Sequence, residues 1–285
     1  MYARAYQARG LAFMLKFMLI TNQPDIAQFV YAQGVERIFV DLEILGKKER
    51  QGHLNTVISC HTLEDVRQIR QAVPKAELLV RINPINPRTA QEVNAVIAAG
   101  ADLLMLPMFT SALQVLALTH IIDGRVPLVP LVETPAAVDA LAEVIAIPGV
   151  TEIYIGLNDL SLALQYKFLF QPLANGMLEK MASILRAEGI PFGFGGIARV
   201  GQGKLPAEQV MTEHLRLGSS CVILSRAFHG GANNLQELNN NINFAAEIQR
   251  LRDAENNLSK RDKQKIDQDF KQLVATIDGI AVAVA

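Results

Sequence analysis

The chain has 285 residues, 50% hydrophobic and 19% charged, which suffices for a large buried core and excludes a disordered protein. Its 27 basic and 28 acidic residues sum to a formal charge of -1, which excludes a general attraction to nucleic acid or anionic lipid. Cys60 and Cys221 match no metal-binding or redox spacing, so we interpret them as two ordinary buried thiols of a soluble, cytoplasmic protein.

Residues 1–14 are interpreted as a ragged leader rather than a signal peptide. A convincing cleavage site is missing, Lys16 interrupts the apolar stretch, and Met14 is an alternative start. The stretch LKFMLI that follows predicts a first strand. No apolar run has the length that a membrane span needs.

Residues 15–230 repeat one unit: a helical pattern, then a glycine or proline, then a short continuous apolar run. A glycine just past a helix accepts the left-handed cap conformation, and a short apolar run is typical of a strand buried on both faces. After LKFMLI, seven further runs fit this description: RIFVD, ELLVRI, DLLMLP, PLVPLVE, EIYIG, PFGFGG and CVILS. The pattern predicts an α/β protein with a (β/α)8 TIM barrel. An open, doubly wound sheet is the structural alternative, although no Gly-x-Gly-x-x-Gly fingerprint follows the first strand.

Residues 231–285 predict a C-terminal helical extension, because apolar residues recur there at helical spacing without a following strand. Two interpretations stay open. The segment is either an arm that packs on the barrel or on a neighbouring subunit, or a last barrel helix with a frayed tail.

A barrel of this kind carries its active site at the carboxyl ends of the strands. Charged side chains at such ends are rarely there for packing, because each must be paired or desolvated. The candidates at the strand ends, in chain order, are Asp41, Glu43, Arg81, Asn83, Pro107, Glu133, Asn158, Asp159, Gly195, Gly196, Ser225 and Arg226.

Glu133 and Asp159 follow consecutive predicted strands and form a candidate metal site. Two carboxylates with few softer ligands nearby suit a hard ion such as Mg²⁺ or Mn²⁺. Gly156 is expected to let the chain turn sharply before Asp159. Taken singly, Glu133 is also typical of a helix N-terminal carboxylate and Asp159 of an N-cap.

Arg81 closes an extended strand in LLVRINP, where nearby prolines oppose a helix. Its planar guanidinium can bind a substrate carboxylate or an enolate oxygen. A salt bridge from Arg81 to Asp41 or Glu43 is the alternative, and both functions are compatible.

The segments DLE, VRINP, ETP and GLND resemble the HpcH/HpaI aldolase and citrate lyase beta-subunit family over about residues 15–230. The resemblance implies an Mg²⁺-dependent enzyme of the phosphoenolpyruvate/pyruvate barrel superfamily that forms a homo-oligomer, a trimer or hexamer. It implies that Glu133 and Asp159 are the metal ligands and that Arg81 binds the substrate. The backbone of Gly156, Leu157, Asn158 and Asp159 would meet the substrate carboxylate, with Pro107 ending the fourth strand.

One position departs from this family. Three residues beyond Asp41, where aldolases of the family carry a histidine and citrate lyase-like members an aspartate, this chain has Ile44. Four residues of the following loop are candidate substitutes for the base: Lys47, Lys48, Arg50 and His53. Glu43 acting through a metal-bound water is another, and a solvated charge run is the interpretation without function.

The other histidines are interpreted as structural. His61 precedes a helix as part of its cap, and His120 and His214 lie inside amphipathic helices. His229, shortly after the last strand, is a weak candidate for the site. The glycine-rich segment with Arg199 and Lys204 after the seventh strand could form a lid or bind an anion.

These observations lead to the hypothesis of a class II aldolase type carbon–carbon lyase, in which a 2-oxo acid reacts through a pyruvate-like enolate. No lysine ends a predicted strand, which argues against a Schiff-base aldolase. Two alternatives stay open: an acyl-CoA lyase of the citrate or malyl-CoA type, with Lys47, Lys48 and Arg50 as the basic cluster, and a catalytically lapsed barrel that serves binding or assembly.

Overall fold

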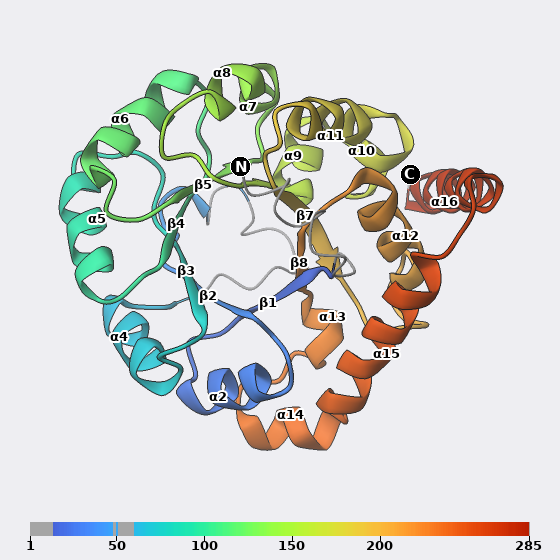
Figure 1. Cartoon of the computed structure of the whole chain (residues 1–285), viewed down its shortest axis with the longest axis horizontal. Helices are drawn as coiled ribbons and strands as arrows, with labels where there is room; N and C mark the ends of the chain where they lie inside the picture. Colours follow the sequence, from blue (N-terminus) through green and yellow to red (C-terminus); the bar gives the residue numbers. More distant parts are fainter. Residues whose placement is uncertain (1–13, 48–49, 51–59, 285) are drawn as a thin grey trace. The chain divides into compact units, whose positions relative to one another are not determined.

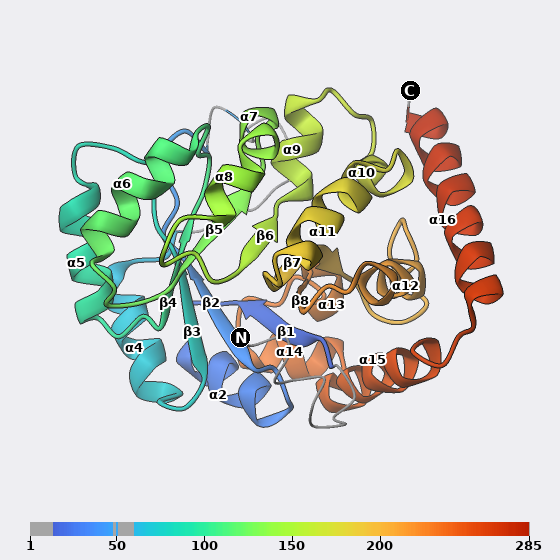
Figure 2. The same ribbon diagram turned by 45° about the horizontal axis from the view of Figure 1, so that its top comes forward.

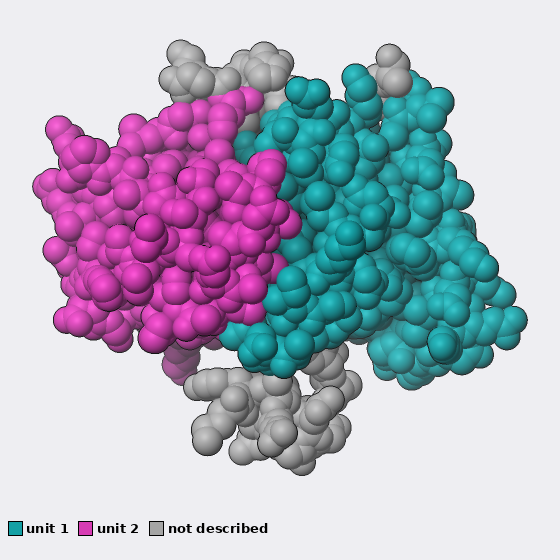
Figure 3. All heavy atoms as spheres, turned by 90° about the horizontal axis from the view of Figure 1, so that it is seen from above, with its two compact units in different colours: residues 1–17, 155–285 teal, residues 18–154 magenta. Residues whose placement is uncertain are grey.

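The computed structural model describes residues 14–47, 50 and 60–284. The chain forms two compact units, which Figure 3 colours separately. Unit 2 comprises Met18–Tyr154, and unit 1 comprises Met1–Phe17 together with Ile155–Ala285.

The strands are parallel wherever their pairing is defined, and their order is that of a closed barrel, β1-β2-β3-β4-β5-β6-β7-β8. Within unit 1 the amide of Lys16 in β1 donates to the carbonyl of Ser220, just before β8, at 2.9 Å. The predicted (β/α)8 barrel is confirmed, and the open-sheet alternative is wrong. The strands, coloured in chain order in Figure 1, are β1 Lys16–Ile20, β2 Arg37–Asp41, β3 Glu77–Arg81, β4 Leu103–Leu106, β5 Leu128–Val132, β6 Ile153–Ile155, β7 Phe192–Ile197 and β8 Cys221–Leu224.

Helices follow the strands, as the repeated unit predicts. In unit 2 these are α2 Pro24–Ala32, α4 Leu63–Ala72, α5 Thr89–Ala98, α6 Ala112–Ile122, α7 Pro135–Asp139 and α8 Leu141–Ile145. In unit 1 they are α9 Leu157–Ala163, α10 Gln171–Ala174, α11 Met177–Ala187, α12 Ala207–Leu217 and α13 Arg226–His229. Local sequence starts several of them: Thr62 and Asp65 form a capping box on α4, and Thr134 caps α7 ahead of Pro135.

The register between β2 and β3 determines which side chains lie together at each end of this strand pair. Arg37 pairs with Glu77 at the amino ends of the two strands, and Asp41 pairs with Arg81 at their carboxyl ends. Every residue of β2 is buried. Both ends of this strand pair therefore place charged side chains inside the protein.

At the amino end, Arg37 is only 1% exposed and lies between two glutamates. Its Nη1 and Nη2 donate to the two carboxylate oxygens of Glu152 at 2.6 and 2.9 Å, and its Nε donates to Glu77 Oε2 at 2.6 Å. The amino ends of barrel strands usually serve stability rather than catalysis. We therefore assign this ion pair to the stability of unit 2.

The C-terminal extension of unit 1 consists of α14 Leu235–Asn241, α15 Phe244–Leu258 and α16 Lys263–Val284. Helix α16 contacts α10 and α12, and Figure 2 shows it running past them. Its residues Leu273 and Ile277 are fully buried, and Arg216 of α12 stacks on Phe270 at 4.4 Å. The described tail is therefore helical and packs on its own unit, so the frayed-tail alternative is wrong.

His214 is fully buried in unit 1, and its burial is expected to make the stability of the protein depend on pH. Its ring stacks on Phe194 at 3.8 Å, and its Nδ1 lies 2.8 Å from Ser219 Oγ. Burial lowers its pKa to about 3, against 6.5 in the unfolded chain. Between these two values the unfolded state binds more protons. The contribution of neutral His214 to the free energy of unfolding is therefore fully present above pH 6.5. Below pH 6.5 the free energy of unfolding should fall by up to about 1.4 kcal/mol per pH unit.

Denaturant unfolding at pH 7.0, 6.0 and 5.0 would measure this slope. His214→Phe preserves the stacked ring and removes the titrating group, so its slope should be smaller. An identical slope in the variant would show that other groups cause the acid sensitivity.

Candidate active site

The carboxyl ends of β2 and β3 carry a buried ion pair between Asp41 and Arg81. Nε and Nη2 of Arg81 donate to the two oxygens of the Asp41 carboxylate, each at 2.8 Å. Nη1 of Arg81 also lies 3.4 Å from Glu43 Oε2. The salt bridge predicted as an alternative for Arg81 is thus present to both carboxylates.

Two further cations from the loop after β2 join this cluster. Nζ of Lys47 lies 2.6 Å from Asp41 Oδ2 and 3.6 Å from Glu43 Oε2, and the Lys47 side chain is 4% exposed. Nη2 of Arg50 donates to Glu43 Oε1 at 2.5 Å. A solvated charge run is therefore the wrong interpretation for Lys47 and Arg50. Lys48 and His53 lie outside the described residues.

The charges fix the protonation of the central pair. Burial by itself raises the pKa of Asp41, but Arg81 and Lys47 outweigh it and hold the pKa of this carboxyl well below its usual range. Burial opposes the charge of Arg81, yet Asp41, Glu43 and Glu133 raise its pKa further above its already high value. Asp41 is consequently an ionised anchor and a poor proton acceptor at neutral pH.

Glu133 follows β5 directly and is buried in unit 2. Its Oε1 accepts the backbone N–H of Met108 at 3.0 Å. Met108 follows Pro107 at the end of β4 and has a φ of 54°, which is uncommon for a residue other than glycine. This loop conformation directs a backbone donor at Glu133, as strained residues at functional sites often do.

Asn83 holds the segment that follows Asp41. Its Oδ1 accepts the backbone N–H groups of Ile44 and Leu45 at 2.9 and 3.0 Å, and its Nδ2 donates to the Leu42 carbonyl at 3.2 Å. The Ile44 side chain is 57% exposed. The position at which the resemblance expects a histidine or aspartate thus presents an apolar group to solvent.

In unit 1, Asp159 is the third residue of α9 and is buried. It lies in the first turn of the helix, so the N-cap interpretation is wrong, and Gly156 is the N-cap. Gly156 has φ -84° and ψ 88°, which any residue can adopt. The chain passes from β6 into α9 at Gly156, as expected, without a left-handed conformation there.

Gly195 and Gly196 lie inside β7 rather than after it, which corrects their predicted place. Gly195 has a φ of +57°, and a Cβ there would approach Leu157 Cδ1 at 3.0 Å. Leu157 begins the helix that carries Asp159. A glycine inside the strand thus lets the start of α9 pack closely on β7.

Gly195→Ala should lower the free energy of unfolding by more than the about 1–2 kcal/mol that a left-handed alanine costs, because Leu157 must also move. Gly176→Ala is the matched control, since Gly176 has a φ of +79° and a Cβ added there would meet nothing within 4 Å. Denaturant unfolding of both variants would measure the difference. Equal losses would show that the Leu157 contact is unimportant.

His61 is a neighbour of the cluster that the sequence prediction missed. Its Nδ1 accepts the backbone N–H of Asp41 at 3.0 Å, whereas Thr62 is the N-cap of α4. Burial lowers the pKa of His61, and Asp41 partly offsets this effect. No local sequence pattern distinguishes this histidine, because its partner, the backbone of Asp41, lies 20 residues earlier in the chain. His120 and His214 do lie in helices, as predicted, and His229 ends α13. Of the two cysteines expected to be buried, Cys221 is buried, whereas Cys60 is exposed.

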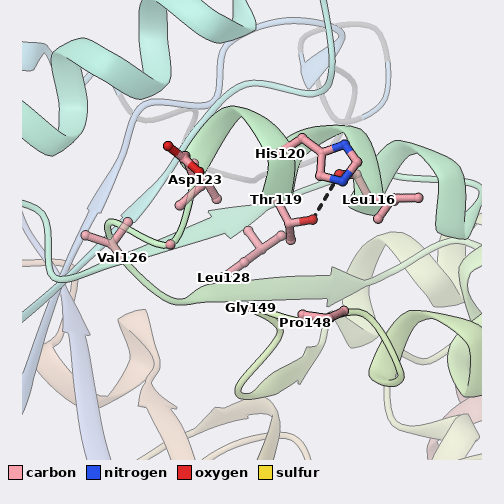
Figure 4. A pocket seen from close by; sticks show the side chains of 10 residues that line it. Leu116, Thr119, His120, Asp123, Val126, Leu128, Pro148 and Gly149 are labelled. Carbon is pink, nitrogen blue, oxygen red and sulfur yellow. Dashed lines mark hydrogen bonds between the residues drawn. The ribbon is translucent and has the colours of Figure 1, made fainter.

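Figure 4 shows the residues that line a groove of about 560 Å³ in unit 2. It is lined mainly by the C-terminal part of α6, by Leu128, and by Pro148 and Gly149. Leu128 is the first residue of β5, whereas Glu133 follows its last residue, roughly 16 Å further along the strand. The groove is therefore at the opposite end of the strand from the candidate active site.

The donor chemistry of Glu133 and Asp159 suits a hard divalent ion. Both are carboxylates with little exposure, and Mg²⁺ commonly takes one or two carboxylates and completes its shell with water and substrate oxygens. Within the described ranges, no group of three or more His, Cys, Asp or Glu is arranged to hold a metal.

The family model for HpcH/HpaI aldolase/citrate lyase matches residues 16–187, which is more than half of the chain. The chain belongs to the HpcH/HpaI aldolase/citrate lyase family. The resemblance inferred from the four segments is thereby confirmed. Membership in the HpcH/HpaI family supports a lyase of aldolase or citrate lyase type.

Several solved structures share this fold. An HpcH/HpaI aldolase from Desulfitobacterium hafniense DCB-2 is 17% identical with a TM-score of 0.59, covering 78% of this chain and 88% of that one. A family protein from Burkholderia cenocepacia J2315 is 15% identical with a TM-score of 0.59, covering 78% and 92%. Citrate synthase SbnG is 12% identical with a TM-score of 0.57, covering 78% and 89%. At these identities the likeness establishes the fold alone.

No curated protein matches the chain. None of the helices in the described part of the chain has both the length and the apolar character that crossing a membrane requires.

Proposed function

We propose that this HpcH/HpaI family member is a divalent-metal-dependent carbon–carbon lyase that forms or cleaves a 2-oxo acid through a pyruvate-like enolate. The observation that carries the proposal is the buried charged cluster at the carboxyl ends of β2 and β3. The negative charge of Glu133 also raises the pKa of Arg81 in this cluster. Barrel enzymes keep their chemistry at this end of the strands. Burying several charges carries a desolvation cost even when they are paired, and perturbed charged groups of this kind cluster at functional sites.

Glu133 and Asp159 are proposed to hold Mg²⁺ or Mn²⁺. When bound, the ion would supply positive charge for the oxygen on which the enolate develops. The proposal rests on the carboxylate chemistry of the two residues, their burial, and their positions after β5 and β6.

The chain's own residues would bind and orient the substrate. Arg81 keeps donors beyond those that it gives to Asp41, because a guanidinium carries five N–H groups. These donors would hold the substrate carboxylate or the enolate oxygen, while Asp41 and Glu43 keep the guanidinium in place. The backbone of Leu157 and Asn158, at the start of α9, would also meet the carboxylate, as the family resemblance implies.

The acyl-CoA lyase is the less favoured alternative. Of its proposed basic cluster, Lys47 and Arg50 are already paired with Asp41 and Glu43, so they do not offer a free groove for nucleotide phosphates. Lys48 lies outside the described residues. Acetyl-CoA-dependent condensation is the activity that would favour this alternative.

The test is pyruvate release from a 4-hydroxy-2-oxo acid, assayed with Mg²⁺, with EDTA, and after adding Mn²⁺ back to the EDTA-treated protein. We expect chelation to abolish the reaction and Mn²⁺ to restore it. Activity that is unaffected by chelation would refute the metal mechanism. A protein that binds neither Mn²⁺ nor oxalate, a mimic of the enolate, would instead be a lapsed barrel.

The homo-oligomer of three or six subunits stays a prediction. Light scattering of the purified chain would measure the subunit number.

A further inference from the structure

We propose that Lys47 is the proton-transferring residue of this site, taking the place left by Ile44. The inference rests on the proposed lyase function and deepens it. The Lys47 amine donates to Asp41 Oδ2 at 2.6 Å, at the carboxyl end of β2.

Lys47 combines three properties that the chemistry needs. Its side chain is 4% exposed, so water does not compete strongly for its protons. Its ammonium group has three donors, and its contacts with Asp41 at 2.6 Å and Glu43 at 3.6 Å leave at least one for a substrate oxygen. A lysine amine can also lose and regain a proton, which a guanidinium does not do in proteins.

The other groups near Asp41 fit this role less well. Arg50 and Arg81 are guanidinium groups bound to carboxylates. His61 uses Nδ1 to accept the Asp41 backbone N–H, so its neutral ring carries the proton on Nε2 and has no free acceptor nitrogen. Asp41 itself stays ionised, as its ion pairs require. Glu43 is likewise held by Arg50 and Arg81, so among the described residues Lys47 is the group that remains.

The step balances in both directions. In condensation, the enolate carbon bonds to the carbonyl carbon of the acceptor, and the π pair of that carbonyl moves to its oxygen. This oxygen takes a proton from Lys47 Nζ, the 2-oxo carbonyl re-forms, and water reprotonates the amine. In cleavage, the ammonium first gives a proton to water, and the amine then takes the hydroxyl proton of the substrate. The carbon–carbon bond breaks, its electron pair passes to the enolate, and the enolate carbon takes a proton from water to give pyruvate.

Three variants test the inference in the metal-loaded full-length protein. Lys47→Ala removes the amine, and Lys47→Arg preserves the charge without a transferable proton. We expect both to lower kcat for pyruvate release by about 100-fold or more, the scale of lost acid–base catalysis. Oxalate inhibition should change less than about threefold, since general acid–base loss does not remove uniform binding. Lys75→Ala, an exposed lysine of the same unit before β3, is the control and should keep wild-type kcat.

Rescue by added amine separates proton transfer from a structural role. Ethylamine should raise the kcat of Lys47→Ala at least several-fold and leave the Lys75→Ala variant unchanged. Full activity in Lys47→Ala or Lys47→Arg would overturn this inference but not the proposed function. The same holds for a loss of activity that ethylamine does not reverse and that accompanies weaker oxalate binding. A wild-type protein without metal-dependent pyruvate release would overturn the proposed function and this inference with it.

Discussion

Glu133→Gln is expected to abolish metal-dependent pyruvate release. The substitution preserves the shape of the side chain and its acceptor for the Met108 N–H, but it removes one of the two proposed anionic metal ligands. Because losing a mere outer-shell partner costs roughly 10–100-fold in metal affinity or activity, we expect a larger loss here. Mn²⁺ titration followed by electron paramagnetic resonance, together with the pyruvate assay, would measure both effects. Asp159→Asn should behave in the same way.

The matched control for this prediction is Glu143→Gln, an exposed glutamate of α8 in the same unit. It makes the same chemical change without touching the strand ends, so Mn²⁺ affinity and activity should equal those of the wild type. Unchanged Mn²⁺ affinity in both Glu133→Gln and Asp159→Asn would contradict the metal site.

Arg37→Met should have the largest effect on stability. The variant leaves Glu152 buried without the guanidinium that now donates to both of its oxygens. Breaking a buried ion pair by removing one partner costs about 3–5 kcal/mol, because the other charge remains desolvated. Denaturant unfolding monitored by circular dichroism would measure the loss.

Two controls test the physical reason for this loss. The double variant with Glu152→Leu as well should recover much of the stability, since a hydrophobic replacement of a buried pair is often neutral. Arg67→Met should cost at most about 1 kcal/mol, because the Arg67–Glu64 pair on α4 is exposed. A double variant no more stable than Arg37→Met would contradict the ion-pair explanation.

The barrel itself could be predicted from the sequence, because its strands are short, continuously apolar and separated by helical patterns. A parallel barrel brings the carboxyl ends of its strands to one face, so the residues that end each run identify the candidates. Asp41, Glu43, Arg81 and Glu133 can be identified in this way from the sequence alone. The sequence also predicts the helix that begins at Pro135, since proline is favoured in the first turn.

The sequence does not show which glycines adopt a positive φ. Gly156 and Gly195 both follow or end apolar runs, yet only Gly195 has a positive φ, and it lies inside β7. The residue type says that the backbone is free to adopt an unusual conformation. Which glycine uses that freedom depends on what packs against it, here Leu157 at the start of α9.

The sequence alone determined the barrel, the strand ends and the chemical types present at them, since all three depend on local periodicity and chain order. Only the tertiary structure decided which charges are paired: that Lys47 reaches Asp41, that Arg50 reaches Glu43, and that His61 accepts the Asp41 amide. A run of charges after a strand looks the same whether it is solvated or folded inward. The difference lies in the distance and burial of partners far apart in the chain, which no local pattern records.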